Sequence, residues 1–424
     1  MGIQLRRILP AAVWQGYNTK VQPAPVPRPS RGPADETAVS ARRALAGFFL
    51  LGAVLSSLGA ILPAWKHHLE IDYVMVGNYF FSLNIGLLAG ARTAGALISR
   101  KGIGFVLSSG SGLAAVGIFF LALVSPPASA WLRVLGLFFV GAGAGLANGG
   151  IFQALAPMYE HDRAVTINLA GTLAGLGCLV TSLLVAGAFY VYTVASILFF
   201  LGSIPAFFLA WYGRSRFPSV LAGRTPSLRE ALSVLRDPGP ILFALVLFFQ
   251  FGNEWSIAGW LPLFLIQRMG WSPESALFML AFYWLCLLVG RVAAQALLPR
   301  LHHGKLLMGS VLSAMFGCFV LSMTNNRFGA LSGIFFAAAG FALIFPLVIE
   351  KMGVRFPSYH PALFNGFVAL AITGGLLANG SLGYWVDLWG IGVVMLLPLA
   401  GTILVFLLLL LITLEAKLSG DAPV

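Results

Sequence analysis

One carboxylate stands inside an otherwise apolar run of this sequence. Glu254 lies in the segment FQFGNEWSIAGW, residues 249–260, among aromatic and aliphatic side chains. A charged side chain at the centre of a membrane helix costs roughly 2.5 to 3.5 kcal/mol on insertion. Glu254 is therefore expected to face a cavity, to pair with a cation, or to take up a proton, because burial disfavours the charged form of a carboxyl group.

Further polar and aromatic side chains share a helical face with Glu254. Gln250, Asn253, Glu254 and Ile257 follow one another at i, i+3, i+4 and i+7, and Trp260 lies two turns beyond Asn253. Amides and carboxylates hydrogen-bond hydroxyl groups, and an indole ring packs against the C–H face of a sugar, so the set suits a polyhydroxylated ligand. The alternative is a polar contact between neighbouring helices, which Asn and Gln commonly make.

Other polar groups inside apolar segments are candidates by the same argument. The candidates for lining a binding cavity are Asn148, Asn168 and Asn365, followed by Asn78, Asn84 and Trp284. Each of these side chains could instead satisfy a neighbouring backbone group.

The elements that must position these residues are membrane helices. The chain has 424 residues, of which 59% are hydrophobic and 9% charged, with a mean hydropathy of +0.90, unlike ordinary soluble domains. A spanning helix needs about 20 mainly apolar residues, and a barrel strand is shorter. Twelve such stretches start near Ala44, Tyr73, Gly104, Ala130, Ala164, Tyr192, Gly239, Pro273, Leu306, Phe328, Pro361 and Gly390. We expect an all-α membrane protein with twelve transmembrane helices in two six-helix halves.

Basic residues predict the orientation of these helices. With the N-terminus in the cytoplasm and an even number of spans, only Lys66, Arg133, Arg268 and Arg327 fall on the outer side, which satisfies the positive-inside rule. Both termini are expected to be cytoplasmic. The formal net charge of +12 then reflects topology, and no nucleic-acid partner is expected.

The organisation along the chain follows from composition. Residues 22–33 (QPAPVPRPSRGP) are rich in Pro and lack core-forming side chains, so a disordered tail is predicted, and residues 8–14 are too short for the apolar region of a signal peptide. Three cysteines fall inside predicted spans and offer no disulfide framework. The expected segments are a disordered basic cytoplasmic tail at 1–43, an N-terminal half at 44–212, a cytoplasmic linker at 213–238, a C-terminal half at 239–415 and a tail at 416–424.

The two halves repeat one another in sequence. Gly52, Ser56 and Gly59 recur 200 residues later as Gly252, Ser256 and Gly259, and Asn168 and Asn365 are repeat mates further along. A parallel duplication of six spans about an axis along the membrane normal is expected of alternating-access transporters, whose substrate site lies at mid-membrane between the halves.

Four segments resemble a known family. Residues 95–102 (GALISRKG) are similar to the signature G-x-L-x-D-R-x-G of the major facilitator superfamily, and residues 160–164 (EHDRA) to its E-x-x-R motif. Residues 252–260 (GNEWSIAGW) and 283–291 (YWLCLLVGR) resemble the fucose-permease-like branch of sugar:proton symporters. The sequence departs from the signature at Ser99, where the motif has Asp, so a charge pair of the cytoplasmic gate is weakened or moved.

The resemblance implies a secondary active transporter of a sugar or similar polyhydroxylated solute, working by alternating access. Glu254 would couple transport to protons, or would serve as an oxygen ligand if the coupling ion were Na⁺; no cofactor is expected. The candidate gating residues are Arg92, Arg100, Arg291, Arg300, Glu160 and Arg163. They would pair with carboxylates or helix C-terminal carbonyls, whereas the alternative for Arg92 and Arg291 is snorkelling to lipid headgroups.

Two alternatives keep the same fold: proton-driven export of a drug or organic anion, and a membrane nutrient sensor that does not transport. Anion export would favour a cationic cavity, and no deep position is expected to be Lys or Arg. A sensor would carry a folded signalling tail, which neither terminus offers. An enzyme is not expected, because the chain has no metalloprotease, nucleophile-elbow or phosphate-loop motif. The expected partners are a small-molecule substrate and the lipid bilayer, with a monomer in a bacterial cytoplasmic membrane.

Overall fold

The structure is a computed structural model, and it describes the backbone of residues 33–68, 72–161, 163–217, 238–297, 303–355 and 361–418. Within these ranges the side chains of 33–38, 66–68, 157–161, 163–165, 238, 295–297, 354, 361–369 and 418 are not described. The helices are α1 Pro33–Leu45, α2 Gly47–His68, α3 Tyr73–Lys101, α4 Ile103–Leu123, α5 Ala130–His161, α6 Arg163–Ala188, α7 Val194–Arg214, α9 Pro238–Met269, α10 Pro273–Leu297, α11 His303–Met323, α12 Arg327–Arg355, α13 Pro361–Trp389 and α14 Val393–Leu418.

The predicted all-α fold with twelve long helices is confirmed. Helices α2 to α7 and α9 to α14 begin within a few residues of the predicted starts. Among the described residues, eleven stretches are long and apolar enough to cross a membrane. Helix α13, 29 residues long, is the twelfth member of the bundle. Their outward-facing side chains are apolar, as a lipid environment requires, because lipid cannot satisfy exposed polar groups.

Helix α1 corrects the prediction of a disordered tail over residues 1–43. The sequence PADETAVSARRAL carries Pro at its first helical position and two basic residues in its last turn, both of which favour a helix. Ala41 and Ala44 are buried, and α1 packs against α5 and α2. Three stretches lie outside the described residues: 1–32, 419–424, and 218–237, which is most of the predicted linker at 213–238.

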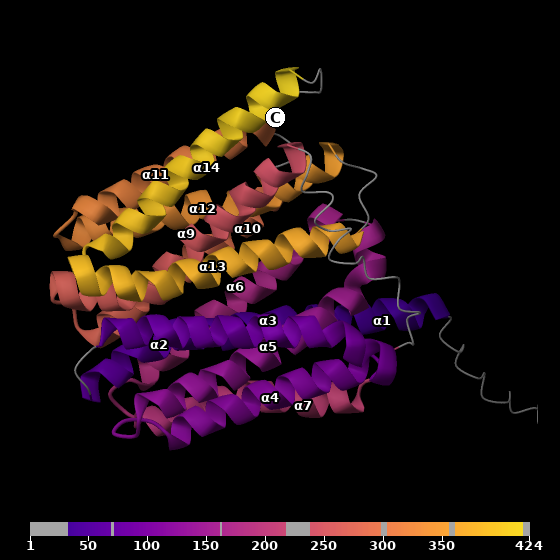
Figure 1. Ribbon diagram of the computed structural model, residues 1–424, viewed down its shortest axis with the longest axis horizontal. Helices are drawn as coiled ribbons and strands as arrows, with labels where there is room; N and C mark the ends of the chain where they lie inside the picture. Colours follow the sequence, from indigo (N-terminus) through magenta and orange to yellow (C-terminus); the bar gives the residue numbers. More distant parts are fainter. Residues whose placement is uncertain are drawn as a thin grey trace, which may run out of the picture.

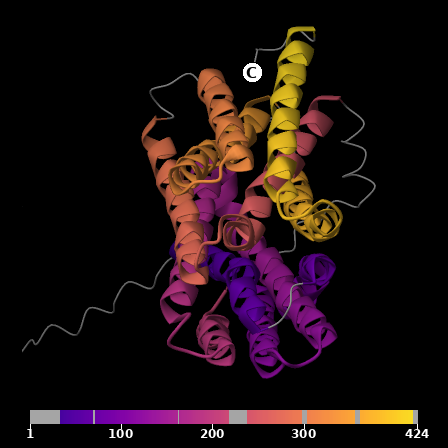
Figure 2. The same ribbon diagram turned by 90° about the vertical axis from the view of Figure 1, so that its left-hand side faces the viewer.

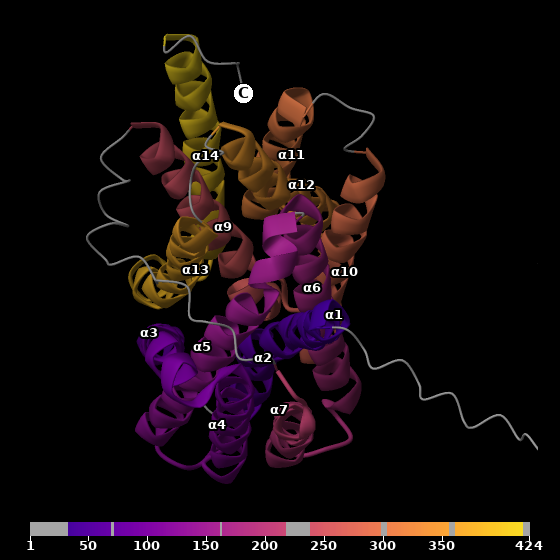
Figure 3. The same cartoon turned by 90° about the vertical axis from the view of Figure 1, so that its right-hand side faces the viewer.

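The two halves repeat the same packing. Helix α2 packs on α6 as α9 packs on α13, and α3 packs on α5 as α10 packs on α12. Helix α4 lies against α5 and α7, and its counterpart α11 lies against α12 and α14. Figure 1 shows the first half below and the second half above, and Figure 3 shows the same division from the face that carries α1. Two six-helix halves are therefore present, as the sequence repeat predicted.

Each contact between the halves has a counterpart made by the equivalent helices of the two repeats. Helix α3 packs on α13, and its counterpart α10 packs on α6, while α2 and α9 meet at the centre. This correspondence indicates an approximate twofold axis running along the helices. Figure 2, which looks along this direction from the end opposite α1, shows most of the first half below and most of the second half above. A site on the axis is therefore built from both halves.

The bundle has two ends, and the halves meet closely at one of them. We call the end with α1 and the end of α14 the terminal face, and the other end the opposite face (Figure 1). Near the opposite face α3 and α13 are in backbone contact: a Cβ atom on Gly77 would lie 2.5 Å from the Gly380 carbonyl oxygen, and one on Gly383 would lie 2.6 Å from the Gly77 Cα. Small residues permit such close approach of membrane helices. The halves are therefore closed against each other at the opposite face.

Candidate functional site

A cavity of about 150 Å³ lies between the two halves. Its walls come from α2, α3, α5 and α6 of the first half and from α9, α10, α12 and α13 of the second. The lining residues Ile167, from the start of α6, and Arg291, from near the end of α10, place it toward the terminal face. By the volume that one buried water needs, the cavity has room for on the order of ten water molecules. It has the location expected for a solute site between two repeats.

An ion pair lies at the wall of this cavity. Arg291 of α10 donates from Nη2 to Oε1 of Glu254 of α9 at 2.8 Å, and the two side chains are 9% and 3% exposed. The Tyr283 hydroxyl, two turns before Arg291, donates to the Glu254 backbone oxygen at 2.9 Å and fastens α10 to α9. A buried carboxylate requires a compensating group, and Arg291 supplies it. Of the options predicted for Glu254, the structure shows two: it lines a cavity and it pairs with a cation.

Arg291 also bridges the two halves. Its Nη1 donates to the Gly171 carbonyl oxygen of α6 at 2.8 Å, and the Asn168 side chain of α6 donates back to the Arg291 carbonyl oxygen at 3.3 Å. The sequence placed Arg291 near the end of its helix as a gating residue that pairs with a carboxylate or with helix C-terminal carbonyls. It lies near the end of α10 and pairs with Glu254 at the cavity wall, so the expectation that no deep position carries a Lys or Arg is wrong.

Three buried polar atoms of the cavity wall have no hydrogen-bond partner among the described residues. They are Glu254 Oε2, Trp284 Nε1 and Asn379 Oδ1. Each unsatisfied group costs about 1 to 3 kcal/mol. The set contains one donor and two acceptors, and a ligand with hydroxyl groups can both donate to carboxylate and carbonyl oxygens and accept from an indole N–H.

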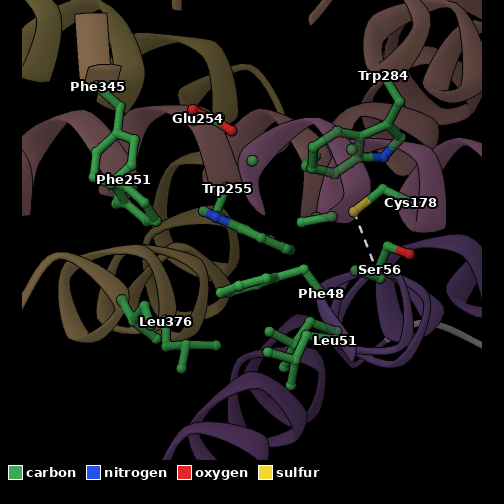
Figure 4. A pocket seen from close by; sticks show the side chains of 18 of the residues that line it. Phe48, Leu51, Ser56, Cys178, Phe251, Glu254, Trp255, Trp284, Phe345 and Leu376 are labelled. Carbon is green, nitrogen blue, oxygen red and sulfur yellow. Dashed lines mark hydrogen bonds between the residues drawn. The ribbon is translucent and has the colours of Figure 1, made fainter. Parts of the chain in front are cut away.

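Aromatic rings surround the ion pair. Trp255 and Trp284 meet edge to face with centroids 5.5 Å apart, and Phe251 meets Phe345 at 5.0 Å. Figure 4 shows Glu254 between the Phe251 and Phe345 rings on one side and Trp284 on the other. Edge-to-face pairs hold rings in fixed orientations. The wall formed by the second half is thus made of rings in fixed orientations, with the Glu254–Arg291 ion pair among them.

The prediction that Gln250, Asn253 and Trp260 share the cavity face of Glu254 is wrong for this structure. The lining positions of α9 are Phe251, Glu254, Trp255, Ala258 and Gly259. At about 100° per residue, this face is centred near Phe251, with Glu254 at its edge and Asn253 and Trp260 nearly opposite.

The three displaced side chains are buried in protein contacts. The Asn253 amide lies against Gly401 of α14. The Trp260 indole donates to the Asn379 backbone oxygen at 3.1 Å and stacks on Phe80 at 6.1 Å between centroids. Gln250 is fully buried, and neither of its amide atoms has a hydrogen-bond partner among the described residues. Trp260 thus makes the polar contact between helices that was the alternative, whereas Gln250 and the Asn253 Nδ2 atom have no partner among the described residues.

The structure places the remaining predicted cavity residues as follows. Asn148 and Trp284 line the cavity. Asn168 is buried one step behind it, on the backbone of Arg291. Asn84 is buried away from the cavity, and Asn78 accepts a 2.7 Å hydrogen bond from Tyr384 across the closed opposite face. The side chain of Asn365, in α13, lies outside the described residues.

The predicted gating residues other than Arg291 contribute no described contact between the halves. Arg92 and Arg100 are exposed on α3 toward the terminal face. Arg300, Glu160 and Arg163 lie outside the residues whose side chains are described, so their gating role stays a prediction.

Sequence reasoning missed Asn379 and Trp255. Asn379 lies in the apolar segment GLLANGSLG, where the argument applied to other intramembrane Asn residues would have found it. Trp255 follows Glu254 directly, but its neighbour Trp260 was favoured by a spacing that proved to follow the wrong face of α9. Both residues could be found as polar or aromatic side chains within apolar segments. The sequence did not show toward which side of its helix each side chain points.

Known proteins resemble the chain over most of its length. Residues 9–182 and 44–378 match the Major Facilitator Superfamily. The glucose/mannose transporter GlcP of Bacillus subtilis is 22% identical over 357 residues, 80% of this chain and 85% of that one. The glucose/galactose transporter of Brucella abortus is 25% identical over 386 residues, 83% of this chain and 89% of that one.

Solved structures share the fold. The fucose:proton symporter FucP of E. coli superposes with a TM-score of 0.61 at 18% identity, covering 88% of this chain and 98% of that one. The nucleoside transporter NupG superposes with a TM-score of 0.66 at 13% identity, covering 89% and 98%. The twofold arrangement of six-helix halves, the cavity between them and the match over most of the sequence agree. The chain belongs to the Major Facilitator Superfamily.

Proposed function

We propose that this protein carries a hexose or a similar polyhydroxylated solute across a membrane by alternating access, and that a proton bound at Glu254 moves with the solute. The observation that carries the proposal is the cavity between the halves, lined by Glu254, Trp284 and Asn379, whose Oε2, Nε1 and Oδ1 atoms are buried without a hydrogen-bond partner among the described residues. Sugar hydroxyls can donate to such oxygens and accept from such an N–H group. The two curated relatives, named as glucose/mannose and glucose/galactose transporters, point to the same class of solute.

The charge state of the cavity favours a neutral solute. Arg291 is the cation at the wall, and Glu254 neutralises it at 2.8 Å. An anionic solute would have to displace Glu254 from Arg291, leaving a buried carboxylate without compensation, which is strongly unfavourable. This argues against the export of organic anions.

Alternating access is supported by the close contact at the opposite face and by the position of the cavity. The glycines of α3 and α13 close the opposite face, whereas the cavity lies toward the terminal face. The inter-half contacts there include the hydrogen bond from Arg291 to Gly171, which a rocking motion of the halves would break. The structure therefore represents the state closed at the opposite face.

Proton coupling is proposed from the position of Glu254. Among the described residues it is the acidic side chain that lines the cavity. A proton on Glu254 removes the charge that holds Arg291, while Arg291 keeps its contact with Gly171 in the other half. Proton uptake would thus alter a residue that contacts both halves. Na⁺ bound at Glu254 Oε2 is the alternative coupling ion.

The orientation and assembly are part of the same proposal. The terminal face carries the predicted cytoplasmic Lys and Arg residues, so we place it in the cytoplasm and the protein in a bacterial cytoplasmic membrane. One chain builds the whole cavity, which supports a functional monomer.

Counterflow in proteoliposomes tests transport independently of the coupling ion. Vesicles preloaded with unlabelled glucose should transiently accumulate labelled glucose, and protein-free vesicles should not. Galactose and mannose, tested in the same way, define the range of hexoses. The absence of counterflow for every hexose would contradict the proposed solute class.

A further inference from the structure

The two walls of the cavity differ in chemistry. All its charged side chains and both of its Trp residues come from the second half, on α9 and α10. The Asn379 side-chain oxygen on α13, which has no partner among the described residues, belongs to the same half. Most side-chain partners for the hydroxyl groups of a bound solute therefore lie along one side of the cavity.

The facing wall, from the first half, is apolar. Phe48, Leu51, Leu55, Phe80 and Leu83 of α2 and α3 line it, with Phe152 of α5 edge to face on Phe48 at 5.6 Å. Such a wall gains nothing from a hydroxyl group, because burying a hydroxyl without a hydrogen-bond partner is unfavourable.

Two of the three polar side chains on that wall, Ser56 and Cys178, are engaged in their own half. The Ser56 hydroxyl donates to the Ala53 carbonyl oxygen at 3.4 Å, and the Cys178 thiol donates to the Gly52 carbonyl oxygen at 3.3 Å. Figure 4 shows Ser56 and Cys178 directed at each other, beside Phe48 and Leu51. Asn148 contributes one amide, one turn before Phe152. A fully hydroxylated hexose therefore leaves one of its faces poorly matched.

We infer that the preferred solute is a glycoside with an apolar aglycone, such as an aryl or alkyl glycoside, whose sugar edge binds the second half and whose aglycone packs against the first. The inference rests on the proposed sugar transport and adds the substrate class to it. A sugar ring fills the side with Glu254, Trp284 and Asn379, and an aryl ring adds apolar area that the Phe and Leu wall removes from water. A free hexose makes the contacts of the sugar ring but not those of the aryl ring.

Competition against labelled glucose uptake in proteoliposomes tests the inference. The competitors are methyl glucoside, phenyl glucoside and phenol, which separate the sugar from the aryl group. Phenyl glucoside should compete at a concentration roughly tenfold or more below that of methyl glucoside, the difference expected from burying an aryl ring. Phenol should compete weakly, because it lacks the sugar edge.

A variant of the apolar wall and a matched control test whether the stronger competition by phenyl glucoside depends on that wall. Leu55→Ser places a hydroxyl on the apolar wall and should shrink the advantage of phenyl over methyl glucoside severalfold. Leu123→Ser makes the same change at a residue that is 73% exposed on α4, and should leave the ratio at the parent value. Melting in detergent verifies that both variants fold.

The outcomes separate the inference from the proposed function. Glucose uptake with equal competition by methyl and phenyl glucosides would overturn the glycoside inference and leave sugar transport intact. Competition by phenol as strong as that by phenyl glucoside would overturn it as well, since the sugar edge would then add nothing. Failure of glucose uptake together with failure of every glycoside to bind would overturn both.

Discussion

Arg291 holds Glu254 at 2.8 Å at the wall of a cavity between two six-helix halves. The pair lies within the second half, but the same guanidinium also donates to Gly171 in the first half. One cation therefore contacts both the carboxylate proposed to carry the proton and the interface that must open. The chemistry at Glu254 and the movement of the halves meet at this residue.

Removing one member of the pair should destabilise the protein more than removing both. Arg291→Gln leaves Glu254 buried without a cation, which costs about 3 kcal/mol or more, whereas Glu254→Gln with Arg291→Gln leaves two neutral amides. The apparent melting temperature in detergent should be lower for the single variant than for the double variant. Arg100→Gln, at an exposed site, is the control and should melt like the parent. A single variant as stable as the parent would show that the pair does not form.

Widening the glycine contact between α3 and α13 should open the opposite face. A Cβ atom at Gly383 would lie 2.6 Å from the Gly77 Cα, well inside the usual separation of about 3.5 to 4.0 Å. In Gly383→Ala, a membrane-impermeant maleimide added at the opposite face should label Cys178, which lines the cavity, severalfold faster than in the parent. Cys286 and Cys318 are replaced by Ala in both proteins, so that the label reports Cys178 alone.

The control for this experiment is Gly95→Ala on α3, the other helix of the contact, where an added Cβ would meet nothing within 4 Å. Its labelling rate should equal that of the parent. If Gly383→Ala is labelled no faster than the control, the glycine contact does not close the opposite face.

Gln250 should be dispensable for solute binding. Its amide is fully buried without a described partner and does not line the cavity. Gln250→Leu removes an unsatisfied group that costs about 1 to 3 kcal/mol, so the melting temperature should stay the same or rise, and KM for the transported hexose should not change. Asn379→Leu, at the cavity wall, should raise KM. A matching increase in KM for Gln250→Leu would restore Gln250 to the site.

Arg133 should stabilise the opposite face of the first half without affecting selectivity. It is 3% exposed, donates to the Tyr79 hydroxyl at 2.9 Å and to the Ala128 carbonyl oxygen at 2.8 Å, and lies over the Trp65 ring. Arg133→Ala removes hydrogen bonds from a charged donor, each typically contributing about 1.5 to 3 kcal/mol, and should lower the melting temperature by several degrees.

The matched control for Arg133 is Arg327→Ala. Arg327 is exposed and makes a single described ring contact, with Trp271 at 5.6 Å. Its removal should change the melting temperature little. Equal effects of the two substitutions would contradict a structural role of Arg133, and a changed order of hexose preferences in Arg133→Ala would contradict its separation from the site.

The sequence predicted the fold well because few kinds of structure can span a membrane. Apolar stretches of spanning length have to be helices, and the repeat of Gly52, Ser56 and Gly59 in the second half matched the observed equivalence of α2 and α9. It missed α1, since a helix of 13 residues lacks the length that marked the others.

The site was predicted only in part, because α9 is surrounded by other helices on several sides. This helix contacts α2, α10, α12, α13 and α14, so polar side chains face protein on several sides, and the spacing of Gln250, Asn253 and Glu254 does not reveal which side is hollow. The depth of Arg291 was missed for another reason. Helical side chains point back toward the N-terminus of their helix, so a long side chain near the end of α10 reaches toward the membrane centre.

The most direct test of the account is hexose uptake into proteoliposomes under an imposed inward proton gradient, comparing the parent with Glu254→Gln. The parent should accumulate labelled glucose, and an imposed Na⁺ gradient without a proton gradient should not drive uptake. Glu254→Gln should lose accumulation and keep counterflow. Accumulation that survives the substitution, or that follows Na⁺ in place of protons, would contradict proton coupling at Glu254.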